Sequence, residues 1–278
     1  MVLLMNHFSI IPKYIPVLLK LCNMPLILVT NDDGISSEGI KILSKALQSI
    51  GKVYVVAPER EQSAVGHALT LHRPLKFEKI NNKTYFINGT PTDCIILGVS
   101  RLLPQKPDLI VSGINNGGNM GDDITYSGTV AAAIEGTLLG IPSIAVSFVR
   151  EAKNNKGYLK RSARLQEAAL FAKKLSMQVI KKGLPPDTFL NVNVPDSTEI
   201  KGIKLTRQGK RAYDNSIQEV LDPRGRKHYW IGGGVPKWES GEDTDFEAVQ
   251  SSFISVTPIH LDFTNYKALK DMRKKWKI

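Results

Sequence analysis

The sequence predicts a doubly wound α/β fold, in which a mostly parallel sheet lies between two layers of helices. Strand-like runs alternate with helical segments from residue 24 to residue 195. The first of these runs, 26–30, is continuously apolar, as a strand covered on both faces is. The chain has 278 residues, 42% of them hydrophobic and 23% charged, which is ordinary for a soluble globular protein with a sizeable core.

The expected elements follow one another in strand–helix order. The strands are expected at 26–30, 53–58, 107–115, 142–148 and 189–195. The helices are expected at 37–50, 91–103, 127–140 and 161–182. The first helix has apolar residues at helical spacing, the second has Thr92 or Asp93 near its start, and Gly140 closes the third.

The alternation stops after Pro195. Segments 202–213, 228–234 and 251–261 are strand-like, and 237–250 is polar with one short helical stretch. We interpret this part as a hairpin or an excursion that caps the site or joins a neighbouring subunit. A separate small domain is the alternative, but no linker rich in Gly, Ser or Pro supports it.

Three parts of the chain are expected: an N-terminal extension at 1–23, an α/β domain at 24–258 and a basic tail at 259–278. The extension has neither the basic start nor the cleavage site of a signal peptide, and prolines interrupt it. Met24 directly precedes the first strand, so we expect a start there or a loosely attached extension. The two cysteines form no CxxC motif, which fits a reducing, cytoplasmic location.

The net charge of +11 suggests anionic partners such as nucleotides, polyphosphate, nucleic acid or lipid surfaces. Part of the excess lies in the basic tail, where a charge run is commonly a solvated face. The sequence offers no helix-turn-helix, zinc-finger or RNP-type motif. We therefore expect no dedicated nucleic-acid or membrane partner.

Asp32 and Asp33 follow the first strand directly, and two carboxylates so close repel each other. A divalent cation such as Mg²⁺, Mn²⁺ or Ca²⁺ removes that repulsion, and Gly34 permits the turn that brings both to it. An aspartate at a strand end also commonly caps the following helix, so this pair alone leaves both interpretations open.

Polar clusters also follow the second strand, "APEREQSAVGHALT", and the third, "SGINNGGNMGDD". The carboxyl ends of strands in such sheets form the ligand crevice, so all three clusters are expected to converge. "YSGT" opens a helix whose N–H groups and hydroxyls suit an anion. A surface turn and a plain helix cap are the alternatives, and for Asp122 and Asp123 we favour a solvated or hydrogen-bonding role. Neither GxGxxG nor GxxxxGK[ST] is present.

These residues resemble the SurE survival-protein family of metal-dependent 5′/3′-nucleotidases. The resemblance spans Met24 to about Pro258 through "ILVTNDDG", "VVAPEREQSAVGHALTL", "GTPTDCIILG", "PDLIVSGINNGGNMGDDITYSGTVAAAIEG" and "DFEAV…ISVTP". It implies a Rossmann-like three-layer α/β/α fold with a mostly parallel sheet and a C-terminal β-rich exchange segment, which we expect from about Lys237 onward, in a homodimer or tetramer. The metal ligands that it implies are Asp32, Asp33, Ser63 and Asn115, and the implied phosphate-binding residues are Asn119, Ser127, Gly128 and Thr129.

The expected function is hydrolysis of nucleoside 5′- and 3′-monophosphates, and of short polyphosphate, with one divalent ion (Mg, Mn or another) per subunit. Asp32 or Asp33 is the expected catalytic base for a water. No DxDxT motif is present, so direct water attack is favoured over a covalent aspartyl intermediate. The alternatives are a non-catalytic nucleotide- or phosphate-binding regulator and a nucleic-acid-binding protein.

Two further groups of residues lie near these clusters or carry positive charge. His67 and His72 lie near the second cluster, and we leave them out of the site because such histidines are commonly surface or capping residues. A basic stretch contains Arg207, Lys210 and Arg211. Contact with the base, the ribose or a longer phosphate chain and a plain basic hairpin turn are equally good interpretations of it.

Overall fold

The computed structural model describes residues 24–150, 158–212, 217–231, 237–239 and 241–276. Its strands are β1 (Leu26–Thr30), β2 (Lys52–Pro58), β3 (Phe77–Asn81), β4 (Thr84–Ile87), β5 (Leu109–Asn116), β6 (Ser143–Val149), β7 (Thr188–Pro195), β8 (Gly202–Leu205), β9 (Arg211–Ala212), β10 (Ile217–Leu221), β11 (Lys227–Ile231), β12 (Lys237–Trp238) and β13 (Phe253–His260). Its helices are α2 (Glu38–Leu47), α3 (Pro91–Leu97), α4 (Gly128–Leu138), α5 (Tyr158–Lys182), α6 (Asp245–Gln250) and α7 (Tyr266–Lys275), with the short turns η1 (Gly98–Leu102) and η2 (Gly121–Thr125).

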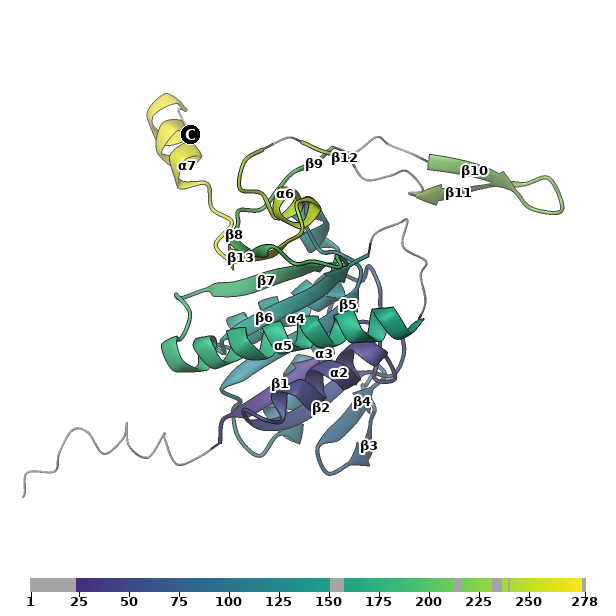
Figure 1. Ribbon diagram of the computed structural model, residues 1–278. Helices are drawn as coiled ribbons and strands as arrows, with labels where there is room; N and C mark the ends of the chain where they lie inside the picture. Colours follow the sequence, from purple (N-terminus) through teal and green to yellow (C-terminus); the bar gives the residue numbers. More distant parts are fainter. Residues whose placement is uncertain (1–23, 151–157, 213–216, 232–236, 240, 277–278) are drawn as a thin grey trace, which may run out of the picture.

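A mostly parallel sheet runs through the centre of the chain (Figure 1), in the order β3-β4-β2-β1-β5-β6-β7-β13-β8. Neighbours are parallel from β4 to β7, whereas β3 pairs antiparallel with β4 and β13 antiparallel with β7. From β1 the chain builds outward to β2 and β4, and then returns to place β5 on the other side of β1. The junction of β1 and β5 is therefore a topological switch point, where ligands bind in such sheets.

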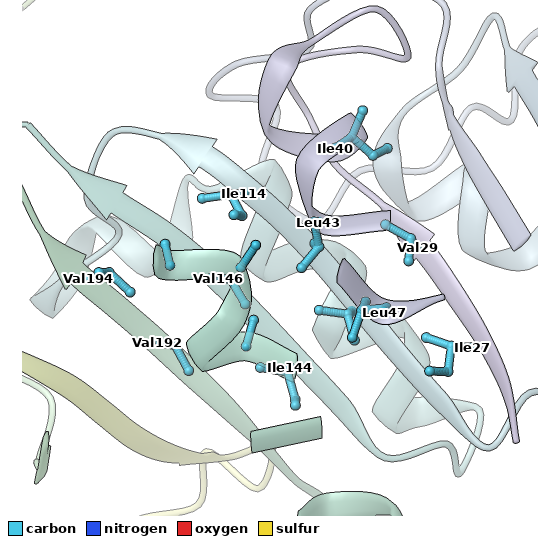
Figure 2. Packing of buried hydrophobic residues seen from close by; sticks show 14 of the residues in the cluster. Ile27, Val29, Ile40, Leu43, Leu47, Ile114, Ile144, Val146, Val192 and Val194 are labelled. Carbon is cyan, nitrogen blue, oxygen red and sulfur yellow. The ribbon is translucent and has the colours of Figure 1, made fainter. Parts of the chain in front are cut away.

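Helices cover both faces of this sheet, as the sequence predicts. Helices α2 and α5 lie side by side on one face, where Ile40, Leu43 and Leu47 of α2 pack on Ile27 and Val29 of β1 (Figures 1 and 2). The alternate β1 residues face the other side, into a second cluster with side chains of α3 and α4. Two buried faces explain the continuous apolar run of β1. The predicted three-layer α/β/α fold is confirmed.

The structure contains elements that the sequence analysis did not predict, among them β3, β4, β10 and α7. Strands β3 and β4 form an antiparallel pair with a short turn at the edge of the sheet. Their signal is the pair of strand-like runs "FEKI" and "TYFI" around Asn81 and Asn82. Helix α7 is another, because the basic tail forms a helix that has Asn265 as its cap and no buried side chain. Helix α3 begins at Pro91, as expected, but its cap is Thr90, which forms a capping box with Asp93.

The C-terminal part returns to the central sheet and then leaves it. Strand β13 lies between β7 and β8, so residues 253–260 complete the sheet of their own chain. The β10–β11 hairpin and α7 extend away from the sheet and its helices (Figure 1). The extension expected at 1–23 lies outside the described residues, as does Cys22. Within the described part of the chain, no helix has both the length and the apolarity to cross a membrane.

Candidate active site

The turn after β1 presents the two neighbouring aspartates. Asn31 closes this turn, since its Nδ2 donates to the Gly34 carbonyl at 3.0 Å and to Ser37 Oγ at 2.8 Å. Gly34 has φ +88° and lies against the backbone of Arg60, where a Cβ would approach to 3.0 Å. Only glycine combines this left-handed conformation with so close a backbone approach. The turn is thus fixed locally, and it directs both carboxylates beyond the strand end.

Asp32 is the more deeply buried of the pair, with 4% of its surface exposed. The Thr129 hydroxyl donates a hydrogen bond to its Oδ1. Burial raises the pKa of the Asp32 carboxyl above its ordinary value, against the opposing effect of the Thr129 hydrogen bond. The first turn of α4 lies so close that a Cβ at Gly128 would be 2.8 Å from the Asp32 Cβ. Helix α4 therefore reaches this carboxylate because residue 128 is a glycine.

Asp33 is half-buried and connects β1 to the loop after β5. Its Oδ2 accepts a hydrogen bond from the Asn116 N–H at 3.2 Å. The neighbouring Asn115 donates from Nδ2 to the Gly117 carbonyl at 2.9 Å. That bond uses the donor end of the amide, and Asn115 Oδ1 is the end that suits a cation. The first and third polar clusters thus meet, as the sequence predicts.

The loop after β2 brings the second cluster to the same place. The Gln62 N–H donates to the Asp32 carbonyl at 2.8 Å, which holds this loop against the aspartate turn. Ser63 is exposed, and its hydroxyl donates to Glu61 Oε1 at 2.7 Å. Asp32, Asp33, Ser63 and Asn115 all line one cavity of about 310 Å³, together with Glu61, Ala64, Asn116, Asn119, Asp123, Tyr126 and Ser127. Three segments far apart in sequence therefore build one site.

The expected phosphate-binding residues divide into two pairs. Asn119 and Ser127 line the cavity. The Ser127 hydroxyl also caps α4 by accepting the Val130 N–H at 3.1 Å. Gly128 and Thr129 lie behind the cavity wall, where they contact Asp32. Their observed contacts hold a carboxylate, and the phosphate-binding role that the resemblance implies for them stays a prediction.

The remaining candidates hold the loops around the site. Arg211 Nη1 pairs with Asp123 Oδ1 at 2.6 Å, and the Arg211 N–H donates to Asp122 Oδ2 at 2.9 Å. These bonds give the second acidic pair the hydrogen-bonding role that the sequence analysis favoured. His67 Nε2 lies 2.9 Å from Glu135 Oε2, which joins the Ser63 loop to α4. Neither His67 nor His72 is among the residues that line the cavity.

The other two members of the basic stretch make surface contacts. Arg207 Nε donates to the Glu242 carbonyl at 3.1 Å, and Lys210 Nζ lies 3.5 Å from Glu239 Oε1. Both Lys210 and Glu239 side chains are mostly exposed. Neither Arg207 nor Lys210 lines the cavity. The structure therefore places these two cations on the C-terminal segments beside the site rather than in its wall.

The sequence analysis did not include Glu61 and Tyr126 in the site, and both line the cavity. Their only signal is adjacency to Ser63 and Ser127 in the two polar clusters. It also missed Asp245, whose carboxylate accepts N–H groups of Gly121 at 2.8 Å and Gly209 at 2.9 Å. Burial raises the pKa of Asp245 above its ordinary value, and these hydrogen bonds oppose the rise. Asp245 thus ties α6 to the loop after β5.

The donor set of the cavity consists of oxygen atoms. Across the described ranges, no group of three or more His, Cys, Asp and Glu side chains is arranged to hold a metal. The candidate centre instead combines two carboxylates with the Ser63 hydroxyl and the Asn115 amide. Hard cations such as Mg²⁺ and Mn²⁺ prefer such ligands and keep several waters. The residues present therefore fit a hard divalent cation better than zinc or another soft metal.

Comparisons with known proteins bear on this site. The family model "Survival protein SurE" matches residues 27–215. The 5′-nucleotidase SurE of Pelobacter propionicus is 54% identical over 246 residues, which is 88% of this chain and 96% of that protein. The 5′-nucleotidase SurE of Geobacter sulfurreducens is 56% identical over 87% of this chain and 90% of its own length. The crystal structure of the SurE protein from Aquifex aeolicus matches with a TM-score of 0.78 and 47% identity, over 90% of this chain and 99% of that one.

Proposed function

The chain belongs to the SurE survival-protein family, and we propose from this premise that it hydrolyses nucleoside 5′-monophosphates to nucleoside and phosphate at the cavity between β1 and β5. Relatives about half identical over most of the chain are named 5′-nucleotidases, and the chain is accordingly a phosphoric monoester hydrolase. One observation carries the choice of site: Asp32, Asp33, Ser63 and Asn115 come from three distant segments and line one cavity at the switch point of the sheet.

A divalent cation, Mg²⁺ or Mn²⁺, is the proposed cofactor, one per subunit. Asp32, Asp33, Ser63 and Asn115 would hold it, because they supply hard oxygen donors around one cavity. When bound, such an ion supplies Lewis-acid stabilisation of a phosphoryl oxygen and lowers the pKa of a bound water. It also offsets the repulsion of two adjacent carboxylates.

The phosphate would lie against the start of α4. Ser127 lines the cavity at the N-terminus of α4, where the helix dipole favours an anion. Asn119 lines the same wall, and its backbone is hydrogen-bonded to Asn191 and Asn193 of β7. These groups orient the phosphate ester for in-line attack and exclude bulk water from one side of it.

A proton acceptor for the attacking water is present in the same wall. Burial raises the pKa of Asp32, which makes its carboxylate a stronger base than an exposed aspartate. The Thr129 hydroxyl donates to Asp32 Oδ1, so the acceptor atom of Asp32 would be Oδ2, and the Asp33 carboxylate is the other candidate base. We therefore propose direct attack by water, with one of these two carboxylates as general base.

Activity on 3′-monophosphates and short polyphosphate is a further part of the proposal that rests on the family resemblance. A non-catalytic nucleotide- or phosphate-binding regulator is the alternative. Phosphate release from a panel of 5′- and 3′-monophosphates and tripolyphosphate, with EDTA or with added Mg²⁺ or Mn²⁺, separates the two. The proposal expects turnover that EDTA removes and a divalent metal restores. No turnover with either metal would favour the regulator.

Variants of the aspartate pair test the assigned residues. Asp32→Asn and Asp33→Asn are expected to lower metal-dependent hydrolysis by about 100-fold or more, since each removes an anionic ligand. Both variants should remain folded without metal, because the carboxylate repulsion is relieved. Glu78→Gln, on the exposed edge strand β3, is the matched control and should keep full activity. Near-normal turnover in both site variants would refute their role.

We also propose that the chain forms a homodimer or a tetramer by exchange of C-terminal elements. The sequence led us to expect exchange from about Lys237 onward. Because β13 pairs with β7 and β8 of its own chain, we narrow the exchanged part to residues beyond Leu261. Helix α7 extends away from the sheet (Figure 1), and it is flanked by Phe263 and Trp276, which are 85% and 58% exposed. Aromatic side chains so exposed are best explained by a partner surface.

A further inference from the structure

The loop between β5 and η2 forms part of the cavity wall, and two asparagines of β7 hold its centre. Asn193 Oδ1 accepts the Asn119 N–H at 2.9 Å, and Asn193 Nδ2 donates to the Asn119 carbonyl at 2.9 Å. Asn191 Nδ2 donates to the same carbonyl at 2.8 Å. One side-chain amide thus engages both backbone groups of Asn119, as a neighbouring strand would.

The asparagine clamp of Asn191 and Asn193 is buried completely, with 0% exposure for both residues. Asparagine is disfavoured in strands, and a buried amide without partners costs about 1–3 kcal/mol. The alternate residues Val192 and Val194 belong to the apolar cluster under α2 and α5 (Figure 2). The opposite face of β7 therefore presents Asn191 and Asn193 to the loop. Apolar packing alone does not require two amides at these positions.

Bonds on either side of Asn119 connect the clamp to the site. The Asn119 side chain lines the cavity, and its Nδ2 donates to Ser147 Oγ at 2.7 Å. Two residues later, the Gly121 N–H donates to Asp245. Asn115, one of the proposed cation ligands, lies at the end of β5, just before this loop begins. Fixing the backbone of Asn119 therefore fixes the wall between the proposed cation ligand and the start of α4.

We propose that Asn193 is a positioning residue for phosphate: its amide sets the backbone of Asn119 and with it the wall of the cavity on which the phosphate lies. The inference rests on the proposed function, because it assumes that phosphate occupies this cavity. Asn193 makes no contact with substrate itself, being fully buried. Its effect is geometric, and small displacements of a positioning group reduce rates strongly.

The substitution Asn193→Asp tests the clamp with almost no change in shape. It keeps an acceptor for the Asn119 N–H but replaces the donor with an oxygen that faces the Asn119 carbonyl. We expect kcat/KM for a nucleoside monophosphate to fall, and the inhibition constant of inorganic phosphate to rise, by about 10- to 100-fold. Asn193→Ser removes the hydrogen bonds to Asn119 without adding a charge. If Asn193→Asp does not fold, the kcat/KM and phosphate inhibition constant of Asn193→Ser alone test the proposal.

Val192→Ala is the matched control, because it lies on the same strand and faces the apolar cluster. It should lower the melting temperature at least as much as Asn193→Ser. Its kcat/KM and phosphate inhibition constant should stay within about twofold of the parent values. The proposal would be overturned if a folded Asn193→Ser variant kept kcat/KM and the phosphate inhibition constant within about twofold of the parent values. It would also be overturned if Val192→Ala changed these two constants as much as Asn193→Ser does.

Calorimetric binding of inorganic phosphate in the presence of Mn²⁺, measured on the same four proteins, separates this inference from the proposed function. If the parent chain binds phosphate but shows no turnover, the proposed activity fails, and the clamp is judged by the ratio of the phosphate affinities. Weaker binding in both Asn193 variants, with parent-like binding in Val192→Ala, supports the clamp. Equal affinity in all four proteins, or no binding in the parent, overturns it.

Discussion

Replacing Thr129 with valine removes one hydroxyl group and nearly preserves the shape of the side chain. That hydroxyl donates to Asp32 Oδ1 inside the protein, where Thr129 is 0% exposed and Asp32 is 4% exposed. A hydrogen bond to a buried charged group contributes about 1.5–3 kcal/mol, and its loss leaves the carboxylate poorly solvated. We therefore expect Thr129→Val to lower the free energy of unfolding of the metal-free protein by about 1.5–3 kcal/mol at neutral pH.

The pH dependence of this loss has a definite sign. Burial raises the pKa of Asp32 above 3.8, so the folded protein holds this proton more tightly than the unfolded chain does. The Asp32 carboxyl therefore favours folding below 3.8, and that stability is lost as the pH rises through its raised folded pKa. The Thr129 hydroxyl opposes the rise, so the variant has a still higher Asp32 pKa. Its deficit should be largest at neutral pH and shrink in acid.

Equilibrium urea unfolding followed by circular dichroism measures this effect, in EDTA, at one protein concentration and at several pH values. Thr129→Ser keeps the hydroxyl and is the control, expected within about 1 kcal/mol of the parent. A valine variant within about 0.5 kcal/mol of the parent at neutral pH would refute the reasoning. If that variant also bound inorganic phosphate more weakly, Thr129 would be a direct phosphate ligand, as the family resemblance implies.

Three other perturbations have expected outcomes. Gly128→Ala should reduce hydrolysis by about 10- to 100-fold, because the new Cβ would lie 2.8 Å from the Asp32 Cβ. Gly98→Ala is the control, because the nearest atom to its new Cβ is a Leu28 methyl at 3.3 Å. Equal activity in the two variants would contradict the predicted clash at Asp32. Deletion of residues 1–23 should leave turnover and melting temperature unchanged, since the sheet begins at Leu26; a loss of several degrees would show that the segment packs on the domain. Truncation after Leu261 should give a chain that is monomeric by light scattering and releases phosphate only weakly. A full-length chain that is monomeric and fully active would rule out the exchange.

The sequence determined the layers of the fold and the chemistry of the site. Continuous apolar runs such as 26–30 require two buried faces, and this alone predicts helices on both sides of the sheet. The Asp32–Asp33 pair next to Gly34 predicts a turn that presents both carboxylates. Because the ends of parallel strands share one edge of a sheet, the convergence of the three polar clusters was also predictable.

Only the tertiary structure decided which residues contact one another at that edge. Asp32 and Thr129 are 97 positions apart, and Asn119 and Asn193 are 74 apart. The order of the strands sets such contacts, including the insertion of β13 between β7 and β8. The local periodicity of a sequence predicts which face of a strand or helix is buried. It does not predict which distant strand lies beside that element in the sheet. The support of the site by Thr129, Gly128 and Asn193 therefore became visible only once the strands were placed side by side.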